Sequence, residues 1–293
     1  MTCGIVNVLK PPGMTSHDVV AFLRRLLGIK RIGHAGTLDP AAAGVLPVFV
    51  GAATRFIEYT AAADKSYRVE MEFGYATDTG DITGEIIDRH DGPLPLVAQI
   101  LAVLPTFIGR QEQIPPMYSA IKFKGKKLYE LARQGITVDR QPRIINITDI
   151  KAIKVTPTKL LFDVTCSKGT YIRTLCTDIG NKVGCPAVMS FLIRTRVGPF
   201  FLHDSLTLEE LAVLKNKALK RVDTALEHLP ALNLTTNQSQ QLLNGQAVTL
   251  KPALAMSDSL VRLYNSNHNF IGIGRIAPAS GNKIIPVKIL PRN

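Results

Sequence analysis

Apolar stretches with strand character are interrupted by helical stretches in this chain, without the regular alternation of a parallel β/α fold. From Tyr67 to Phe73 every second residue is apolar or aromatic, which predicts a strand over Lys65 to Phe73 with one buried face. Further strands are expected over these ranges: Gly4 to Leu9, Ile144 to Val155, Leu160 to Cys166 and Val188 to Val197. The pattern predicts an α+β body built on a mixed sheet.

Helices are expected between these strands. Ser16 is a candidate N-cap for a helix whose apolar positions run from Val19 to Leu27 at helical spacing and end at Gly28. The segment Ile114 to Met117 is too rich in proline for either kind of element. Further helices are expected at Leu96 to Leu104, at Lys126 to Gln134 and from about Thr170 onward.

A domain boundary is expected near Leu229 and Pro230, dividing the chain into residues 1–228 and 229–293. Short apolar strands recur in the second part, between turns rich in Asn and Gly, at Leu260 to Tyr264, Phe270 to Ile276 and Ile284 to Ile289. One acid, Asp258, accompanies a set of basic residues there: Lys251, Arg262, Arg275, Lys283, Lys288 and Arg292. These features predict a small, basic, mostly β module, which either binds RNA or only caps the body.

Several classes of protein are disfavoured by the sequence. The start of the chain lacks a basic leader followed by a long apolar region, so no secretory signal is expected. No unbroken apolar segment reaches the roughly 18 residues of a membrane span. The cysteines show no CxxC pair and no His–Cys spacing, so we expect reduced thiols, no metal and a cytoplasmic protein; they are Cys3, Cys166, Cys176 and Cys185.

Positive charge is in excess and clustered. Lys and Arg number 35 against 23 Asp and Glu, a formal net charge of +12, which favours polyanionic partners through phosphate contacts. In one stretch, only Glu130 and Asp139 oppose a set of seven basic residues: Lys122, Lys124, Lys126, Lys127, Arg133, Arg140 and Arg143. A second cluster consists of Arg24, Arg25, Lys30 and Arg31. A solvated helix face would explain either cluster, but two that flank one loop favour a track for RNA.

That loop, Gly33 to Pro47 (GHAGTLDPAAAGVLP), contains the carboxylate of Asp39. Pro40 keeps the residue before it out of the helical region, and the glycines allow the backbone to approach a ligand closely. The apolar run Val45 to Val50 follows and would anchor the loop in a core. From these residues alone two interpretations are open: an ordinary Asp-Pro turn, or a reactive carboxylate on a rigid support.

Six segments, in order, resemble the motifs of the TruB family of tRNA pseudouridine synthases. The Asp39 loop, read as GHxGTLDPxAxGVLPV, is similar to the catalytic motif of that family. The other five are Lys10 to Ser16 (KPPGMTS), Lys65 to Tyr67 (KSY), Gly74 to Gly84 (GYATDTGDITG), Ile114 to Arg133 (IPPMYSAIKFKGKKLYELAR) and Ser167 to Gly180 (SKGTYIRTLCTDIG). The resemblance covers roughly residues 4 to 200. It extends less distinctly to the tail, where it implies a PUA-like RNA-binding domain.

The resemblance implies an enzyme that converts uridine 55 in the T-loop of tRNA to pseudouridine. The reaction breaks the N1–C1′ bond of a uridine flipped out of its stack, turns the uracil and rejoins it through C5. No cofactor is required, because nothing is oxidised and no outside group is added. The implied partner is the T-arm of tRNA. A stand-alone bacterial type of enzyme is expected, acting in the cytoplasm as a monomer without a protein partner.

The resemblance also assigns roles to particular residues. It makes Asp39 the catalytic aspartate and pairs it with Arg173, whose guanidinium would keep the carboxylate ionised and oriented. It places Tyr67 against the target uracil, for stacking and for proton transfer at C5. The remaining roles, an RNA contact beside the flipped nucleotide and the lining of the uridine pocket, fall to His34 and to Tyr171 and Leu192.

Other functions stay open from the residues alone. An acidic cluster could join Asp39 as the second carboxylate of a glycoside hydrolase, or could be a turn of solvated acids; it comprises Asp78, Asp81, Glu85 and Asp88. A non-catalytic RNA-binding or tRNA-folding protein on the same scaffold is a further alternative, which the presence of Asp39 disfavours. The pseudouridylase of guide-RNA complexes shares the motifs, but this chain lacks long basic tails.

Overall fold

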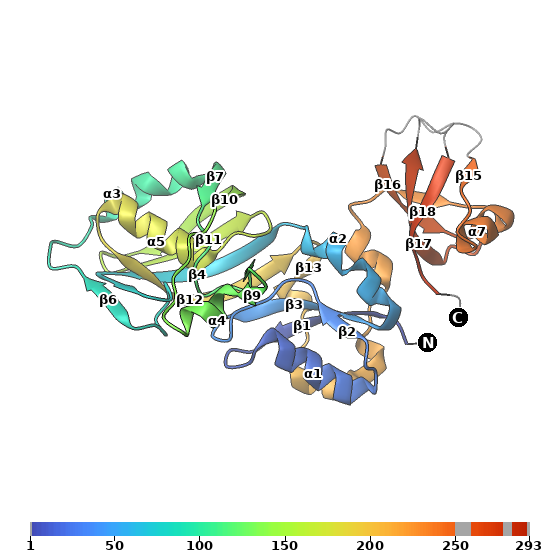
Figure 1. Cartoon of the computed structure of the whole chain (residues 1–293), viewed down its shortest axis with the longest axis horizontal. Coiled ribbons are helices and arrows are strands. Elements are labelled where there is room, and N and C mark those ends of the chain that lie inside the picture. The colour runs from blue at the N-terminus through green and yellow to red at the C-terminus, as the bar shows by residue number, and fades with distance from the viewer. Residues whose placement is uncertain (1, 250–258, 278–282, 292–293) are drawn as a thin grey trace.

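The computed structural model describes residues 2–249, 259–277 and 283–291 of the chain. A large body is joined at one end to a smaller C-terminal module (Figure 1). The predicted fold class is confirmed: the body is α+β with a mixed sheet, and the module is mostly β. Three of the charged residues noted in the tail, Lys251, Asp258 and Arg292, lie outside the described residues.

The body contains a nine-stranded sheet. Its strands are β1 (Gly4–Lys10), β2 (Ile32–His34), β3 (Ala43–Val50), β4 (Lys65–Phe73), β7 (Gly109–Gln113), β10 (Arg143–Val155), β11 (Lys159–Cys166), β12 (Ala187–Val197) and β13 (Phe200–Phe201). The order is β1-β3-β12-β4-β11-β10-β7, with β2 beside β3 and β13 beside β12. The pair β3 and β12 is parallel and the other pairs are antiparallel, so the sheet is mixed. Two small hairpins lie apart from it: β5 (Tyr75–Thr77) with β6 (Ile86–Arg89), and β8 (Lys122–Phe123) with β9 (Lys126–Lys127).

The α-helices are α1 (Ser16–Leu27), α2 (Ile57–Ala61), α3 (Val97–Val103), α4 (Leu128–Ala132), α5 (Ile172–Val183), α6 (Leu208–Leu214) and α7 (Thr236–Leu243). Short 3₁₀ turns are η1 (Gly51–Phe56), η2 (Leu104–Phe107), η3 (Leu202–Asp204), η4 (Lys215–Ala218) and η5 (Val222–Leu226). In the described part of the chain no helix is long and apolar enough to cross a membrane.

The first helix differs from the prediction at its N-terminus. Thr15, not Ser16, is the N-cap: its hydroxyl accepts from the Asp18 backbone N–H at 3.1 Å, while the Asp18 carboxylate accepts from the Thr15 N–H at 2.8 Å. This reciprocal capping box is available only to Thr15, because an acid stands three residues after it. The C-terminal prediction is correct, since Gly28 ends the helix with a φ of 66°.

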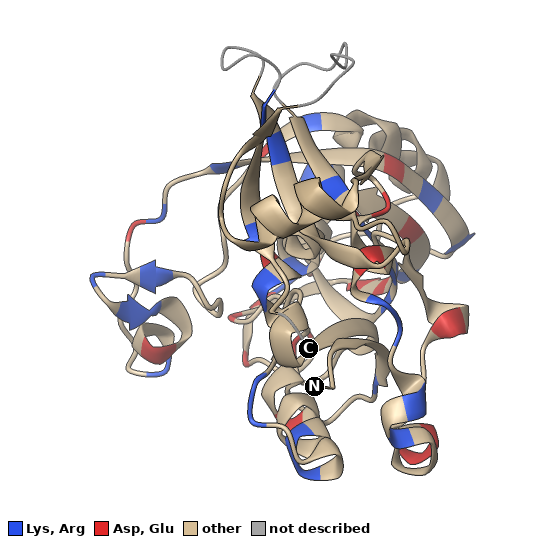
Figure 2. Cartoon of the chain, turned by 90° about the vertical axis from the view of Figure 1, so that its right-hand side faces the viewer, with Lys and Arg blue, Asp and Glu red and all other residues tan. Residues whose placement is uncertain are grey.

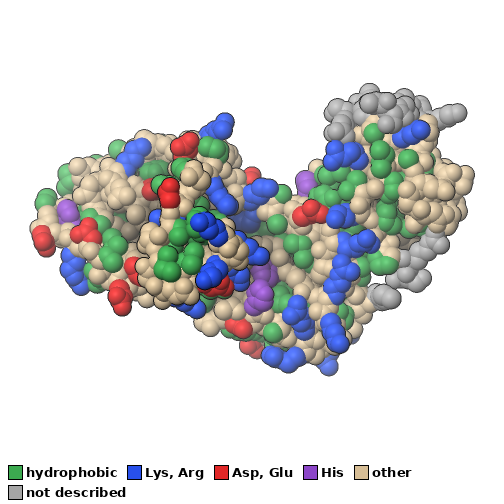
Figure 3. Space-filling view, in the orientation of Figure 1, with side chains coloured by type: hydrophobic (Ala, Val, Ile, Leu, Met, Phe, Trp, Pro, Cys, Tyr) green, Lys and Arg blue, Asp and Glu red, His purple; other side chains and the backbone are tan. Residues whose placement is uncertain are grey.

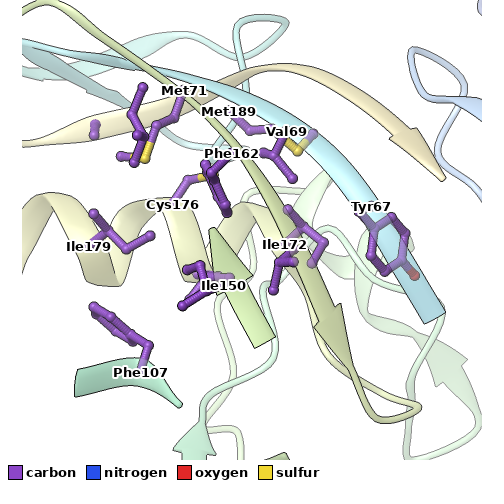
Figure 4. Packing of buried hydrophobic residues seen from close by; sticks show 14 of the residues in the cluster. Tyr67, Val69, Met71, Phe107, Ile150, Phe162, Ile172, Cys176, Ile179 and Met189 are labelled. Atoms are coloured by element: carbon purple, nitrogen blue, oxygen red, sulfur yellow. The ribbon is translucent and has the colours of Figure 1, made fainter. Parts of the chain in front are cut away.

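Strand β4 spans the predicted residues and carries the centre of the core. Its inward side chains, among them Val69 and Met71, are fully buried and pack with Phe162 of β11 and Cys176 of α5. Figure 4 shows Tyr67 on the same strand, at the end of this row of buried side chains. Because truncation of such a core side chain costs roughly 2–5 kcal/mol, β4 and α5 are held firmly relative to each other.

The C-terminal module is built on a five-stranded sheet, in the order β14-β16-β17-β18-β15. Its strands are β14 (Ala231–Asn233), β15 (Val248–Thr249), β16 (Ser259–Tyr264), β17 (Phe270–Ala277) and β18 (Lys283–Ile289). The Phe270 ring packs edge-on against Phe56 of the body, with centroids 5.6 Å apart. The Tyr264 hydroxyl donates to Asp223 Oδ2 at 2.8 Å. An apolar contact and a buried hydrogen bond therefore join the module to the body.

Candidate active site

Asp39 lies in the loop between β2 and β3, and the backbone on both sides of it is tied to neighbouring segments. The Leu38 N–H donates to Ser16 Oγ at 2.9 Å, and that hydroxyl donates back to the Leu38 carbonyl at 3.2 Å. The Gly13 N–H donates to the Pro40 carbonyl at 2.9 Å. The loop is thus a support held by the start of α1.

Lys10, at the end of β1, also holds this loop through its side chain. Its side chain is fully buried, and its ammonium donates to the carbonyls of Pro11, Pro40 and Ala42 at 2.9, 3.2 and 2.6 Å. Burial lowers the pKa of Lys10 to about 8, and the nearby Asp39 carboxylate opposes that shift.

A second buried cation, Arg194 of β12, secures the other side of the loop. Its guanidinium is 1% exposed and donates to the carbonyls of Val45, Gly36 and Thr37 at 2.8, 3.1 and 3.3 Å. The β3 strand approaches β12 closely at Gly44, which has a φ of 113°. A Cβ there would lie 2.2 Å from the Arg194 carbonyl oxygen. Glycine is therefore required where the loop enters β3.

The structure brings Asp39 and Arg173 together, as the sequence resemblance implied. Arg173 Nε lies 3.1 Å from Asp39 Oδ2, and the two side chains are 7% and 44% exposed, respectively. The arginine is thus fixed within the protein while the carboxylate faces open space. A guanidinium so placed orients the carboxylate through a charge-assisted contact.

Further contacts orient the Arg173 guanidinium. Nη1 donates to the Thr79 carbonyl at 2.9 Å, and Nη2 donates to the Tyr118 carbonyl at 2.7 Å. Asp81 Oδ2 lies 3.8 Å from Nη1, and its side chain is 12% exposed. The arginine therefore stands between two carboxylates, one open to solvent and one covered.

A cavity of about 320 Å³ opens beside this pair. Three further residues that the resemblance assigned to the site line it: Tyr67, Tyr171 and Leu192. Lys65, Tyr118, Lys168 and Arg194 also contribute to the wall. The cavity therefore joins the Asp39 loop, the start of β4, the start of α5 and the segment after β7.

Tyr67 is buried in the wall, with 7% of its surface exposed. Burial raises the pKa of the Tyr67 phenol to about 12, and a hydrogen bond from Arg194 acts in the opposite direction. The hydroxyl is thus protonated at neutral pH and lies beside a cation that would stabilise its anion.

His34 differs from its prediction as a loop residue. It is the last residue of β2 and is not among the residues that line the cavity. Its ring packs edge-on against His17, with centroids 5.8 Å apart. Burial lowers the pKa of His34, and the neighbouring His17 and Arg194 act in the same direction. A neutral imidazole beside the loop is the consequence.

Several residues of the site were not identified from sequence. Asp81 was predicted only as part of an acidic cluster, either a second carboxylate of a glycoside hydrolase or a turn of solvated acids; its side chain is 12% exposed and faces Arg173. Lys65 donates to the carbonyls of Ala61 and Ala63, and burial lowers its pKa to about 8. Lys65 had a signal in the sequence, because it shares the inward face of β4 with Tyr67. Arg194 had none, because its partners are more than a hundred residues away.

Metal ligands do not gather in the described residues: no group of three or more His, Cys, Asp or Glu side chains there could hold an ion. The four cysteines are free thiols. Apart from Asp39, the charged residues that line the cavity are cations: Lys65, Lys168, Arg173 and Arg194.

Basic side chains gather around the site and toward the C-terminal module. On the face drawn in Figure 3, Lys and Arg side chains gather near the junction of the body and the module. The segment between β7 and β10, residues 114–142, forms an arm that carries β8, β9 and α4. Figure 2 shows its two short strands, blue with lysine, standing out from the body. Tyr118 OH donates to Asp78 Oδ2 at 3.0 Å and thereby ties the base of the arm to the turn that contains Asp81.

Comparison with known families gives consecutive matches along the chain. Residues 24–172 match the TruB family pseudouridylate synthase (N terminal domain). Residues 173–230 match the tRNA pseudouridylate synthase B C-terminal domain, and residues 230–290 match Pseudouridine synthase II TruB, C-terminal.

Relatives match over nearly the whole chain. A protein of Caldanaerobacter subterraneus named tRNA pseudouridine synthase B is 48% identical over 287 residues, which is 98% of each chain. One of the same name from Moorella thermoacetica is 42% identical over 304 residues, covering 99% of this chain and all of its own. Among solved structures, a chain of a Cbf5-Nop10-Gar1 complex is 29% identical with a TM-score of 0.77, covering 99% of this chain and 86% of its own. A chain of an H/ACA RNP bound to a substrate RNA containing 2′-deoxyuridine is 26% identical with a TM-score of 0.75, covering 99% and 85%.

Proposed function

The chain belongs to the TruB family of pseudouridine synthases, and we propose that it converts the T-loop uridine of tRNA conventionally numbered 55 to pseudouridine. The family assignment makes it an isomerase that modifies tRNA. The T-arm as the bound element and position 55 as the target are the finer parts of the proposal. The alternative of a glycoside hydrolase is set aside, because the matched relatives are pseudouridine synthases.

One observation carries the proposal: an exposed carboxylate, Asp39, is held by the buried Arg173 at a cavity that contains Tyr67. The isomerisation needs a nucleophile or base beside the sugar and the uracil, and a pocket that keeps the freed base. Asp39 supplies the carboxylate, and Arg173 keeps it ionised and oriented. Because the loop is fixed before substrate arrives, little reorganisation is required at the reacting atoms.

The other residues hold and turn the base. Tyr67 stacks on the extruded uracil, and stacking of this kind contributes roughly 1–3 kcal/mol per base. In the net reaction C5 loses a proton and N1 gains one, and the Tyr67 hydroxyl is the group assigned to proton transfer at C5. Tyr171 and Leu192 bound the pocket that retains the uracil during its rotation. His34 contacts the RNA at the edge of the Asp39 loop. The chemistry needs no cofactor, because nothing is oxidised, every carbon, nitrogen and oxygen atom of the product comes from the substrate, and only a proton is exchanged.

The basic surfaces direct the RNA. Phosphate contacts position a nucleic acid without reading its sequence, and the lysines of the arm are suited to that role. We assign catalysis to residues 1–228 and RNA docking to a PUA-like domain of residues 229–293, whose sheet is packed on the body. The enzyme acts as a monomer, without a protein partner, in the cytoplasm where its tRNA substrate is found.

The direct test is to map pseudouridine in tRNA from cells that lack this protein, and then to restore the wild-type gene or the Asp39→Asn variant. Loss of pseudouridine at position 55, with recovery only by the wild-type gene, is the expected result. A T-loop that remains fully modified in the deletion strain would refute the proposed target. Purified protein should modify a T-arm hairpin but not the same hairpin with cytidine at that position.

A further inference from the structure

Gln113, the last residue of β7, makes paired hydrogen bonds to the backbone of Tyr171. Its Nε2 donates to the Tyr171 carbonyl at 3.0 Å, and its Oε1 accepts from the Tyr171 N–H at 2.7 Å. The Gln113 side chain is buried, with 3% of its surface exposed. Both hydrogen bonds join residues that are 58 positions apart in the chain. Both polar ends of the buried amide are therefore used on a single residue.

A clamp on Tyr171 acts on the start of α5. Tyr171 is the N-cap of α5 but has no side-chain capping hydrogen bond of its own. Its carbonyl accepts from the Leu175 N–H at 3.1 Å, so it accepts both the first bond of the helix and the bond from Gln113. The amide thus holds the residue at which α5 begins, and its Oε1 accepts the N-cap N–H, as the N3 side chain does in a capping box.

The start of α5 carries two residues of the site. The Tyr171 side chain lines the cavity, and Arg173, two residues later, holds Asp39. The arm begins immediately after Gln113, and its Tyr118 carbonyl accepts from Arg173 Nη2. The base of the arm is therefore attached to the start of α5 at two points, through Gln113 and through Tyr118.

We propose that Gln113 is a positioning residue for the isomerisation: by clamping the Tyr171 backbone it sets the register of Tyr171 and Arg173 against Asp39. It does not touch the substrate and acts through these two residues. This inference rests on the proposed function, and it concerns the same cavity. It predicts that loss of the clamp slows the chemical step and leaves binding of tRNA, which depends on phosphate contacts, nearly unchanged.

Replacement of Gln113 by glutamate allows the clamp to be made or broken by a change of pH within a single variant. A protonated Gln113→Glu side chain has an O–H to donate to the Tyr171 carbonyl and a carbonyl oxygen to accept the Tyr171 N–H. The ionised form only accepts, and it repels the Tyr171 carbonyl. Burial favours the neutral form of such a carboxyl, so the change of state falls within a workable pH range.

Other titratable groups face this position. Asp178 of α5 and Glu112 of β7 line the same small cavity as Gln113, and Arg143 lies opposite Gln113 in the β7–β10 register. A pH effect of Asp178 alone would appear equally in the wild type and in a matched control, Gln111→Glu. Gln111 lies two residues earlier on β7, lines the same cavity and donates to the Thr106 carbonyl instead of to α5.

Single-turnover rates are measured from pH 5.5 to 8.5 by release of tritium from [5-³H]uridine in tRNA, beside binding and thermal melting at each pH. Gln113→Glu should match the wild type at pH 5.5 and fall roughly 10- to 100-fold below it at pH 8.5, the loss typical of a small misplacement of reacting groups. Gln113→Leu should be slow throughout, and Gln111→Glu should follow the wild-type profile. Binding should stay within about twofold of the wild type, since its phosphate contacts are untouched.

A wild-type rate for folded Gln113→Leu would overturn the inference. A pH–rate profile of Gln113→Glu that runs parallel to that of Gln111→Glu would also overturn it. An equal loss of rate and of tRNA binding at every pH would overturn it as well, because such a loss indicates a merely structural role. If Gln113→Leu does not fold, the comparison of Gln113→Glu with itself across pH decides. An inactive wild-type enzyme on this tRNA would instead count against the proposed function.

Discussion

Arg173 Nε lies 3.1 Å from Asp39 Oδ2, and the two partners differ in burial: the arginine is 7% exposed and the aspartate 44%. An exposed ion pair contributes little to stability, but a buried guanidinium cannot leave its partner without cost. The pair therefore serves the placement of a carboxylate that substrate can reach.

Asp39→Asn should abolish formation of pseudouridine while leaving the protein folded. The amide is nearly isosteric, but it has no negative charge for nucleophilic or base catalysis and leaves Arg173 without its exposed partner. Binding of T-arm RNA should persist, and single-turnover assays should detect no product. Asp88→Asn, on an exposed acid, is the matched control. Substantial product from the Asp39 variant would contradict the role of Asp39, and Asp81 would be the next carboxylate to test.

Tyr67→Phe separates stacking from proton transfer, because it keeps the ring and removes the hydroxyl. The pKa of Tyr67 is raised to about 12, so the phenol stays protonated from pH 6 to 9 and its own ionisation should add no step to the rate profile in that range. We expect a loss of turnover of more than about 100-fold with little loss of binding. If Tyr67→Phe turns over normally while Tyr67→Ala does not, the tyrosine is a stacking platform only.

Lysines of the arm should contribute to the salt dependence of tRNA binding. Lys122 and Lys126 are exposed on the β8–β9 hairpin, and their joint replacement by Gln should reduce the slope of log K against log [salt] by about 1.5 to 2. The control is the equivalent replacement of Lys151 and Lys154, which are exposed on β10. An unchanged slope for the arm variant would show that its lysines make no phosphate contacts.

Asp178→Asn should stabilise the protein at neutral pH. Burial raises the pKa of Asp178 to about 6, so between about pH 4 and 6 the folded state binds more protons than the unfolded state. This carboxyl therefore lowers the free energy of unfolding progressively as the pH rises from about 4 to about 6, and the penalty is absent below about pH 4. With allowance for partial solvent screening, the free energy of unfolding in urea at pH 7.5 should increase by about 1–2 kcal/mol. The gain should vanish near pH 4, and Asp91→Asn, on an exposed acid, should show none.

Short-range patterns in the sequence encode the local elements. The alternation along β4, the helical spacing that ends at Gly28 and the irregular segment after Ile114 are short-range signals, and each is found where it was predicted. The N-cap of α1 was predicted one residue too late, although its signal was present as Asp18, three residues after Thr15. The residues assigned to the site came from resemblance to a family, and their catalytic roles remain the proposals stated above.

The residues that surround Asp39 come from distant parts of the chain, and the strand order brings them together. The strand order places β12 between β3 and β4, so that Arg194 reaches both the Asp39 loop and Tyr67. The turn after β5 directs Asp81 to Arg173, and the end of β7 brings Gln113 to Tyr171. No local pattern encodes these contacts, because a side chain buried by a neighbour from elsewhere in the chain has the same sequence signature as one that meets solvent. Strand pairing depends on packing of the whole core, and the residues of the site come together as a consequence of that pairing.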